Sequence, residues 1–92
     1  MIVSFSHKGL EKFFKTGSKS GINPAFVLRP ELQLAALDAA ATPKQMDIPG
    51  WGLHALQGRL AGHRAVKVNA NWRMTFRFNG ENAEVLDLQD YH

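Results

Sequence analysis

The chain of 92 residues is long enough for one domain with one modest core, which we expect to span residues 1–92. It contains no cysteine, which excludes disulfides, thiolate metal sites and cysteine nucleophiles. The net charge is only +3, yet residues 48–80 contain no aspartate or glutamate and carry five Lys or Arg and two His. A one-signed block of this kind is typical of proteins that bind phosphate-rich ligands.

The N-terminal region is predicted to form a short strand at residues 2–5 and then an amphipathic helix. Leu10, Phe13 and Phe14 lie at helical spacing, and Gly17 is placed to end the helix. His7 is expected near the helix N-terminus without a catalytic role. The opposite helix face carries Lys8, Lys12, Lys15 and Lys19, which either contact phosphates or simply face water.

A second helix is predicted to start at Asn23-Pro24, to kink or restart at Pro30, and to stop at Thr42-Pro43. Its alanine-rich sequence indicates core scaffold, with no chemistry visible on it. Residues 44–52 are rich in proline and glycine and are predicted to form a loop. Within it, Trp51 is expected either to stack on a base or to pack against the core.

Residues 71–78 show the clearest strand pattern in the chain. Trp72, Met74, Phe76 and Phe78 alternate with Arg73, Thr75 and Arg77. This period of two predicts a half-buried strand with an aromatic core face and two outward arginines. The arginines indicate an anionic partner, although a solvated charged sheet face is the commoner explanation of such a pattern.

Two further strands are predicted beside the central one, at residues 64–70 and 83–88, and Asn79-Gly80 is a hairpin signal. A two-residue turn would place Leu86 and Leu88 on the face of Arg73. We therefore predict a longer connection, which buries the leucines and brings Asp87 opposite or near Arg73. The expected fold is α+β, with two helices on one sheet face and a basic opposite face.

Four motifs, in their order and spacing, resemble the HigB-type toxins of the RelE/ParE toxin superfamily from bacterial type II toxin–antitoxin modules. They are Phe5-Ser6-His7-Lys8-Gly9-Leu10, Leu53-His54-Ala55-Leu56-Gln57-Gly58-Arg59, Asn71-Trp72-Arg73-Met74-Thr75-Phe76 and Asp90-Tyr91-His92. The resemblance covers essentially the whole chain. It implies a single RelE-like domain, a small antiparallel sheet of three to four strands with two N-terminal helices packed on one face.

The resemblance also implies a ribosome-dependent endoribonuclease that cuts messenger RNA in the ribosomal A site without a cofactor. The expected partners are the ribosome, mRNA and a cognate helix-turn-helix, HigA-like antitoxin, with operator DNA reached only through that antitoxin. We expect a cytoplasmic protein that does not use a membrane, because signal-peptide features and long apolar runs are absent from the sequence.

By resemblance, the catalytic roles fall on His54, Arg73, Asp90, Tyr91 and His92. The candidate RNA or phosphate contacts are Gln57, Arg59, Arg64, Lys67, Asn71, Arg77, Lys8 and Lys12. The chain departs from the family at Gln57, where a lysine is common, and at Asn69, where a basic residue is common. Either Arg59 or a histidine compensates for Gln57, or activity is weakened.

Metal-independent RNA cleavage needs a base for the 2′-OH, cations for the phosphoryl charge and an acid for the leaving 5′-oxygen. Arg73 offers a bidentate phosphate fork, and His54 and His92 suit proton transfer near neutral pH. Asp90 is expected to orient an imidazole or Tyr91. Which group is the base stays open. His63 is expected to be solvent-exposed, and the histidine spacing indicates no metal site.

Two rival functions come from other classes: a toxin of the same fold that inhibits DNA gyrase by binding, and a non-catalytic RNA-binding module that uses only the basic face. A binder has no reason to assemble the full set of catalytic candidates. A degenerate toxin is a third possibility, because Gln57 carries no charge.

Overall fold

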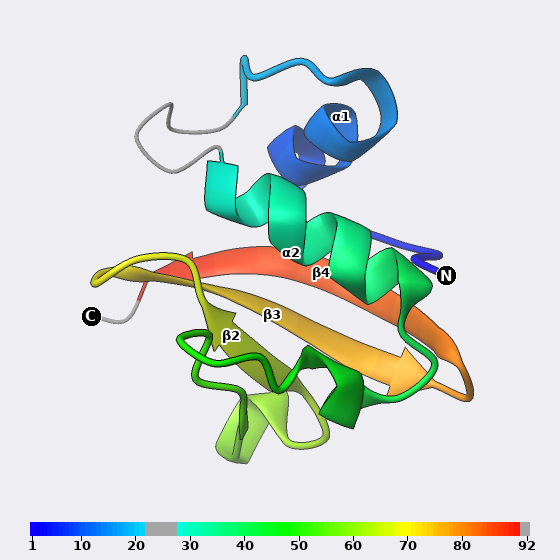
Figure 1. The fold of residues 1–92 in the computed structure, drawn as a ribbon, viewed down its shortest axis with the longest axis vertical. Coiled ribbons are helices and arrows are strands. Elements are labelled where there is room, and N and C mark those ends of the chain that lie inside the picture. Colours follow the sequence, from blue (N-terminus) through cyan, green and yellow to red (C-terminus); the bar gives the residue numbers. More distant parts are fainter. Residues whose placement is uncertain (22–27, 91–92) are drawn as a thin grey trace.

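Two helices and a four-stranded antiparallel sheet form the domain in a computed structural model, which describes residues 1–21 and 28–90 (Figure 1). The strands follow one another across the sheet in the order β1-β2-β3-β4, and both helices lie on the same side of it. In chain order the elements are α1 (Lys8–Thr16), α2 (Leu28–Ala39), η2 (Pro43–Met46), β1 (His54–Ala55), η3 (Gly58–Leu60), β2 (Arg64–Lys67), β3 (Trp72–Asn79) and β4 (Asn82–Asp90). The predicted α+β fold is confirmed.

Helix α1 begins and ends where the sequence predicts. The side chain of His7 caps its N-terminus, because Nδ1 accepts a hydrogen bond of 2.9 Å from the backbone N–H of Leu10. Gly17 ends the helix in the left-handed conformation, with φ of 77°. Leu10 and Phe13 are buried, while the lysines of the outer face are exposed.

Helix α2 places Pro30 within its first turn, where a backbone N–H has no partner inside the helix. Of the two predicted outcomes at Pro30, the kink is wrong, and the described helix instead begins two residues before Pro30. The predicted start at Asn23-Pro24 lies outside the described residues. The predicted loop at residues 44–52 is corrected in part, since η2 covers Pro43–Met46 and buries Met46 completely.

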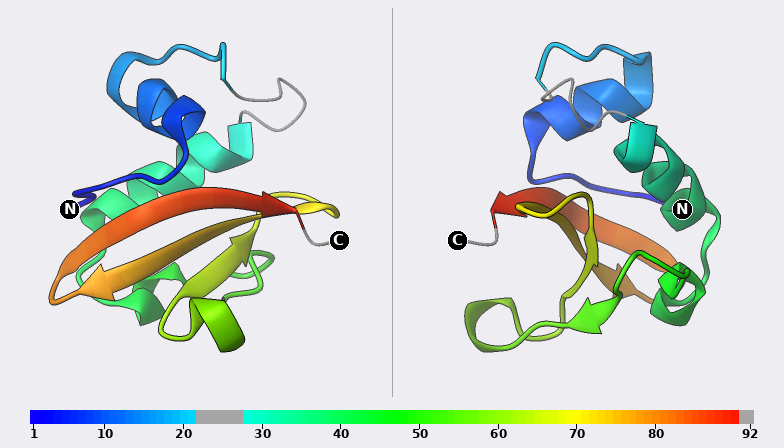
Figure 2. Two further views of the ribbon diagram at one scale, coloured as in Figure 1. Left: turned by 180° about the vertical axis from the view of Figure 1, so that it is seen from behind. Right: turned by 60° about the vertical axis from the view of Figure 1, so that its left-hand side comes forward.

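The N-terminal segment lies beside β4 without forming a continuous strand (Figure 2). Its only ladder contacts in the described chain are two isolated parallel bridges, from Ile2 to Ala83 and from Phe5 to Leu86. The strand predicted at residues 2–5 is thus reduced to these two bridges.

The core lies between the helices and the inner face of the sheet. Met74 and Phe76 have no exposed surface, and Trp72 and Phe78 pack at the margin of the same cluster. Leu34 and Leu37 approach it from α2. In the part of the chain that the structure describes, no helix is both long and apolar enough to cross a membrane.

The register between β3 and β4 corrects the predicted hairpin. Asn79 faces Asn82, so only two residues form the turn, and the predicted longer connection is wrong. The register then shifts by one residue: Arg77 faces Glu84, but Thr75 faces Asp87. This β-bulge contains Val85, whose φ of 51° is unusual for a β-branched residue.

The bulge achieves what the longer loop was expected to achieve. One extra residue in β4 reverses which face the following side chains meet, so Leu86 and Leu88 lie on the core side with Met74. Their predicted burial is therefore right, although its predicted cause is wrong. Asp87 lies opposite Thr75 and is a diagonal neighbour of Arg73.

This register predicts that Leu86→Ala lowers the free energy of unfolding by about 2–5 kcal/mol, because Leu86 is fully buried. Val85→Ala is the control and should have a much smaller effect, since Val85 is only half-buried. Urea denaturation of both variants measures the difference. Equal effects of the two substitutions would contradict the bulged register.

Candidate functional site

The sheet face opposite the helices, here called the open face, carries the charged side chains of the strands. Alternation along each strand assigns its members, and the register groups them into rows. One row holds Lys67, Arg73 and Gln89, the next holds His54, Ala65, Thr75 and Asp87, and the third contains Arg77 and Glu84. Ala65 and Thr75 are buried although they belong to this face, so small side chains form its floor between longer ones.

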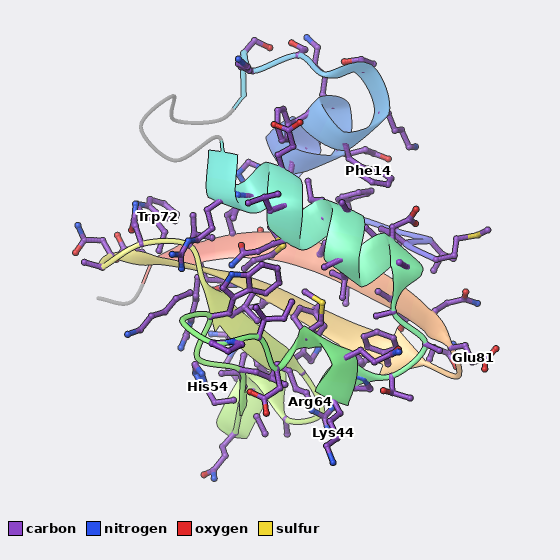
Figure 3. The ribbon with its side chains drawn as sticks, in the orientation of Figure 1. Phe14, Lys44, His54, Arg64, Trp72 and Glu81 are labelled. Carbon is purple, nitrogen blue, oxygen red and sulfur yellow. The ribbon has the colours of Figure 1, made fainter. Side chains whose placement is uncertain are left out.

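His54 stands on the edge strand β1, opposite Ala65, with its ring exposed (Figure 3). Its Nδ1 lies 2.9 Å from the carbonyl oxygen of Gly52. A carbonyl only accepts, so Nδ1 must carry the proton in this contact, and Nε2 of the neutral ring is left as an acceptor. This tautomer is the one that a general base at Nε2 requires.

Lys67 and Arg73 face each other across β2 and β3 and bring two positive charges to the row beside His54. Lys67 is exposed, and its methylenes lie 3.8–3.9 Å from the point where a Gly52 side chain would begin. His54 and Arg73 are two strands and two residues apart, which corresponds to roughly 12 Å between Cα atoms. Two side chains that extend toward each other from such positions can contact the same phosphodiester.

Arg77 is the predicted phosphate ligand whose surroundings differ most from expectation. Its Nε donates to Oε2 of Glu84 at 2.8 Å, and its Nη2 donates to the same oxygen. This bond with Arg77 holds the pKa of the Glu84 carboxyl below its ordinary value of 4.5. Glu84 and Asp87 both belong to the open face, so the face predicted to be basic also carries two carboxylates, of which Asp87 was expected near Arg73.

His63 also differs from its predicted exposure. It precedes β2, and its backbone carbonyl accepts a hydrogen bond of 2.9 Å from the N–H of Leu56. The residue is half-buried, and its Nδ1 is buried without a hydrogen-bond partner in the described structure. Its charge contributes to lowering the pKa of Glu84, after the larger contributions of Arg77 and Asn79.

Three predicted phosphate contacts are not brought to the Arg73 row. Gln57 and Arg59 are exposed and belong to the η3 segment, which follows β1 beyond His54. Arg64 faces Phe76, so alternation assigns its side chain to the core side of the sheet rather than to the open face. Figure 3 shows His54 and Arg64 in the lower part of the view and Glu81 at the β3–β4 turn on the right.

The remaining predicted contacts lie at two separate places. Asn71 is exposed in the β2–β3 connection, next to Arg73 along the chain. Lys8 and Lys12 are exposed on α1, in the helical layer on the other side of the sheet (Figures 1 and 2). These two lysines therefore cannot touch the same phosphate as Arg73.

Asn69 has a structural role that a basic residue cannot fill. Its Oδ1 accepts the backbone N–H groups of Asn71 and Trp72 at 2.8 and 2.9 Å. An amide oxygen can accept both bonds, whereas a lysine or arginine side chain has only donors. Asn69 therefore stabilises the turn that leads into β3.

The end of the chain contributes the last group of predicted catalytic residues. Asp90 is exposed at the end of β4 and faces Trp72 in the register, so its end of β4 adjoins the start of β3 that carries Arg73. Tyr91 and His92 lie outside the described residues. Among the described residues, no group of three or more His, Asp or Glu side chains is placed to hold a metal ion.

Sequence reasoning missed Gly52, whose carbonyl accepts the hydrogen bond from His54 Nδ1 and whose positive φ of 60° favours glycine. Its only signal was its position in a run of glycines and prolines. The two possibilities for Trp51 are also decided in part, because its side chain packs at the margin of the core cluster.

Solved structures share this fold at low sequence identity. YafQ from E. coli matches with a TM-score of 0.65 and 13% identity, over 99% of this chain and 94% of that one. A conserved hypothetical protein from Helicobacter pylori, solved in solution, matches with a TM-score of 0.55 and 17% identity, over 99% and 96% of the two chains. The chain therefore shares the fold of these small α+β domains.

The sequence comparisons narrow this class to one family. The family of the RelE-like toxin of the type II toxin–antitoxin system HigB matches residues 3–92. Endoribonuclease HigB from Proteus vulgaris is 39% identical over 92 residues, which cover all of both chains. This chain belongs to the HigB-like family of type II toxins.

The Arg77–Glu84 pair predicts how stability depends on pH. Because the pKa of Glu84 is lowered in the folded protein, the pair stabilises it above pH 4.5 and loses this effect as the pH falls through the folded pKa. Glu84→Gln should therefore lower the urea midpoint at pH 7, and this difference should shrink as the pH falls below 4.5. A difference that does not change with pH would contradict the charge-based contribution.

Proposed function

We propose that this toxin is an endoribonuclease that cleaves messenger RNA in the ribosomal A site and so stops translation and growth. The observation that carries the proposal is the open face, where His54 presents Nε2 next to the row of Lys67 and Arg73. Family membership supports it, as does the similarity to Endoribonuclease HigB from Proteus vulgaris.

In the proposed reaction, a base takes the proton of the ribose 2′-OH, and the 2′-oxygen attacks the adjacent phosphorus. The bond from phosphorus to the 5′-oxygen breaks, and an acid protonates that oxygen. The products are a 2′,3′-cyclic phosphate and a 5′-hydroxyl. No water is consumed and no electrons are transferred, so the step needs no cofactor.

His54 and His92 share the acid and base roles, and Arg73 stabilises the charge that grows on the phosphoryl oxygens. The proton on Nδ1 of His54 supports a role as base, since its Nε2 is then the free acceptor. Asp90 orients a neighbouring imidazole or Tyr91. Lys67 lies in the Arg73 row and Asn71 in the connection before β3, where both would hold the RNA backbone.

The ribosome is proposed as the element that positions the substrate, because so few catalytic groups leave free RNA poorly oriented. The exposed lysines of α1, including Lys8 and Lys12, would contact ribosomal RNA phosphates on the other side of the domain. Gln57, Arg59 and Arg64 would contribute at the η3 end, and Arg77 would contribute less because Glu84 already binds it.

As a type II toxin, the protein has an antitoxin partner. We propose that this antitoxin is HigA-like, carries a helix-turn-helix, and alone connects the toxin to operator DNA. The proposed place of action is the cytoplasm, where ribosomes translate.

Arg73→Ala and truncation after Asp90 should each abolish growth arrest and remove cuts within translated codons, because the first removes the phosphate fork and the second removes Tyr91 and His92. Loss of one such charge-stabilising donor typically costs about 10²–10³-fold in rate. Mapping of mRNA 5′ ends after induction measures the cuts.

The matched control is Lys44→Ala, which removes an exposed cation from η2 and should leave the cuts in place. Growth arrest that persists in both active-site variants, with intact mRNA and relaxed DNA, would contradict the proposed nuclease function and favour the gyrase-binding alternative.

His54→Gln should lower the rate of cleavage on programmed ribosomes by about 10²–10⁴-fold, because it removes the titratable Nε2. A single-turnover assay across pH checks this and should also show loss of one limb of the pH–rate profile. His7→Asn is the control histidine variant, since asparagine preserves the cap of α1. An unchanged rate in His54→Gln would exclude this residue from proton transfer.

A further inference from the structure

Gln33 is the most deeply buried polar side chain of helix α2, with no exposed surface. Its Nε2 donates a hydrogen bond of 2.6 Å to the backbone carbonyl of Lys67. Its Oε1 is also buried and has no hydrogen-bond partner in the described part of the chain. An unpaired buried amide oxygen is costly, and an apolar side chain at this position would fill the same space without that cost.

The place where Gln33 acts is the junction of three strands. Lys67 is the last residue of β2, where it faces Arg73 of β3. Its N–H donates a bond of 2.7 Å to the carbonyl of Trp51, in the segment that leads into the edge strand β1. The N–H and C=O of one strand residue point to the same side, so the Lys67 carbonyl also points toward this edge. Gln33 supplies the donor that the edge strand would otherwise supply.

This junction leads directly to His54. Trp51 precedes Gly52, whose carbonyl lies 2.9 Å from His54 Nδ1 and whose Cα lies under the Lys67 methylenes. The Lys67 carbonyl thus accepts a hydrogen bond from Gln33, a buried residue of α2. The Lys67 N–H donates to Trp51, which belongs to the segment that holds the His54 imidazole. The bond from Gln33 fixes the Lys67 peptide, and through it the placement of Gly52 and the ring of His54.

We propose that Gln33 is a positioning residue for the cleavage reaction: it sets the Lys67–Gly52–His54 segment against Arg73 without touching RNA itself. This inference rests on the proposed function for its kinetic effect. Its structural part, a fixed Lys67 peptide and a fixed His54 tautomer, is independent of cleavage and can be measured without ribosomes.

Gln33→Met tests the proposal, because methionine matches the length of glutamine but has no N–H donor. The exchange removes one unpaired buried oxygen and leaves the Lys67 carbonyl without its donor, so we expect little net change in stability. Cleavage on programmed ribosomes should fall roughly 10- to 100-fold in kcat with little change in KM. The Lys67 amide should exchange with solvent at least about tenfold faster, and the His54 Nδ1 signal should shift in ¹⁵N NMR spectra.

Leu37→Val is the matched control, since Leu37 is fully buried on the same helix and does not bind Lys67. It should loosen the packing of α2 without moving the Lys67 and His54 signals. Wild-type cleavage in Gln33→Met would overturn the proposal, and so would a loss of cleavage with unchanged Lys67 exchange and an unchanged His54 signal.

The experiments also distinguish failure of the proposed function from failure of the variant to fold. If the wild-type chain does not cleave RNA, the proposed function fails, while altered Lys67 and His54 signals in Gln33→Met would still support the positioning role. If Gln33→Met does not fold, the wild-type side-chain amide of Gln33 supplies the test. Slow exchange of its bonded proton supports the proposal, and exchange as fast as that of the exposed Gln45 amide overturns it.

Discussion

The bulge in β4 is the constraint on which the arrangement of the sheet depends. A strand has only two faces, so a shift of one residue exchanges everything that follows between core and solvent. Before the bulge the ladder pairs Arg77 with Glu84, and after it the ladder pairs Thr75 with Asp87. Leu86 and Leu88 enter the core because of this shift, and Asp90 arrives at the start of β3. The burial of Leu86 and Leu88 and the pairing of Asp90 with Trp72 are thus consequences of one inserted residue.

The open face shows how charge is distributed over a sheet by pairing rather than by composition. The acid-free block of the sequence suggests a uniformly positive surface, but β4 follows that block and brings Glu84 and Asp87 to the same face. Glu84 binds Arg77, and Asp87 accepts bonds from the Leu88 N–H and from Gln89. The register places Lys67 and Arg73 opposite each other in the row beside that of His54.

Local patterns predict what depends on local chemistry. The strand at β3 and the glycine that ends α1 are both decided within a few residues, and both predictions are confirmed. The bulge at Val85 could not be predicted in this way. It makes a two-residue turn after Asn79 compatible with the burial of Leu86 and Leu88, and this compatibility depends on residues far apart in the hairpin. The bond from Gln33 to Lys67 joins residues 34 positions apart, so an apparently inert helix carried no local sign of it. The candidate site was found through family motifs, whereas its supporting contacts appear only in three dimensions.

The two edges of the sheet affect whether the toxin can aggregate when it is not bound to its antitoxin. An exposed edge strand offers unpaired backbone groups to any other chain, and long flat edges promote aggregation. Here β1 contains only two residues, and the other border is covered by a segment that makes two isolated bridges in the described chain. Neither border provides a long ladder for a foreign strand, and the bulge adds twist near the second one. The fold thus protects the free toxin from edge-to-edge self-association without the help of a partner.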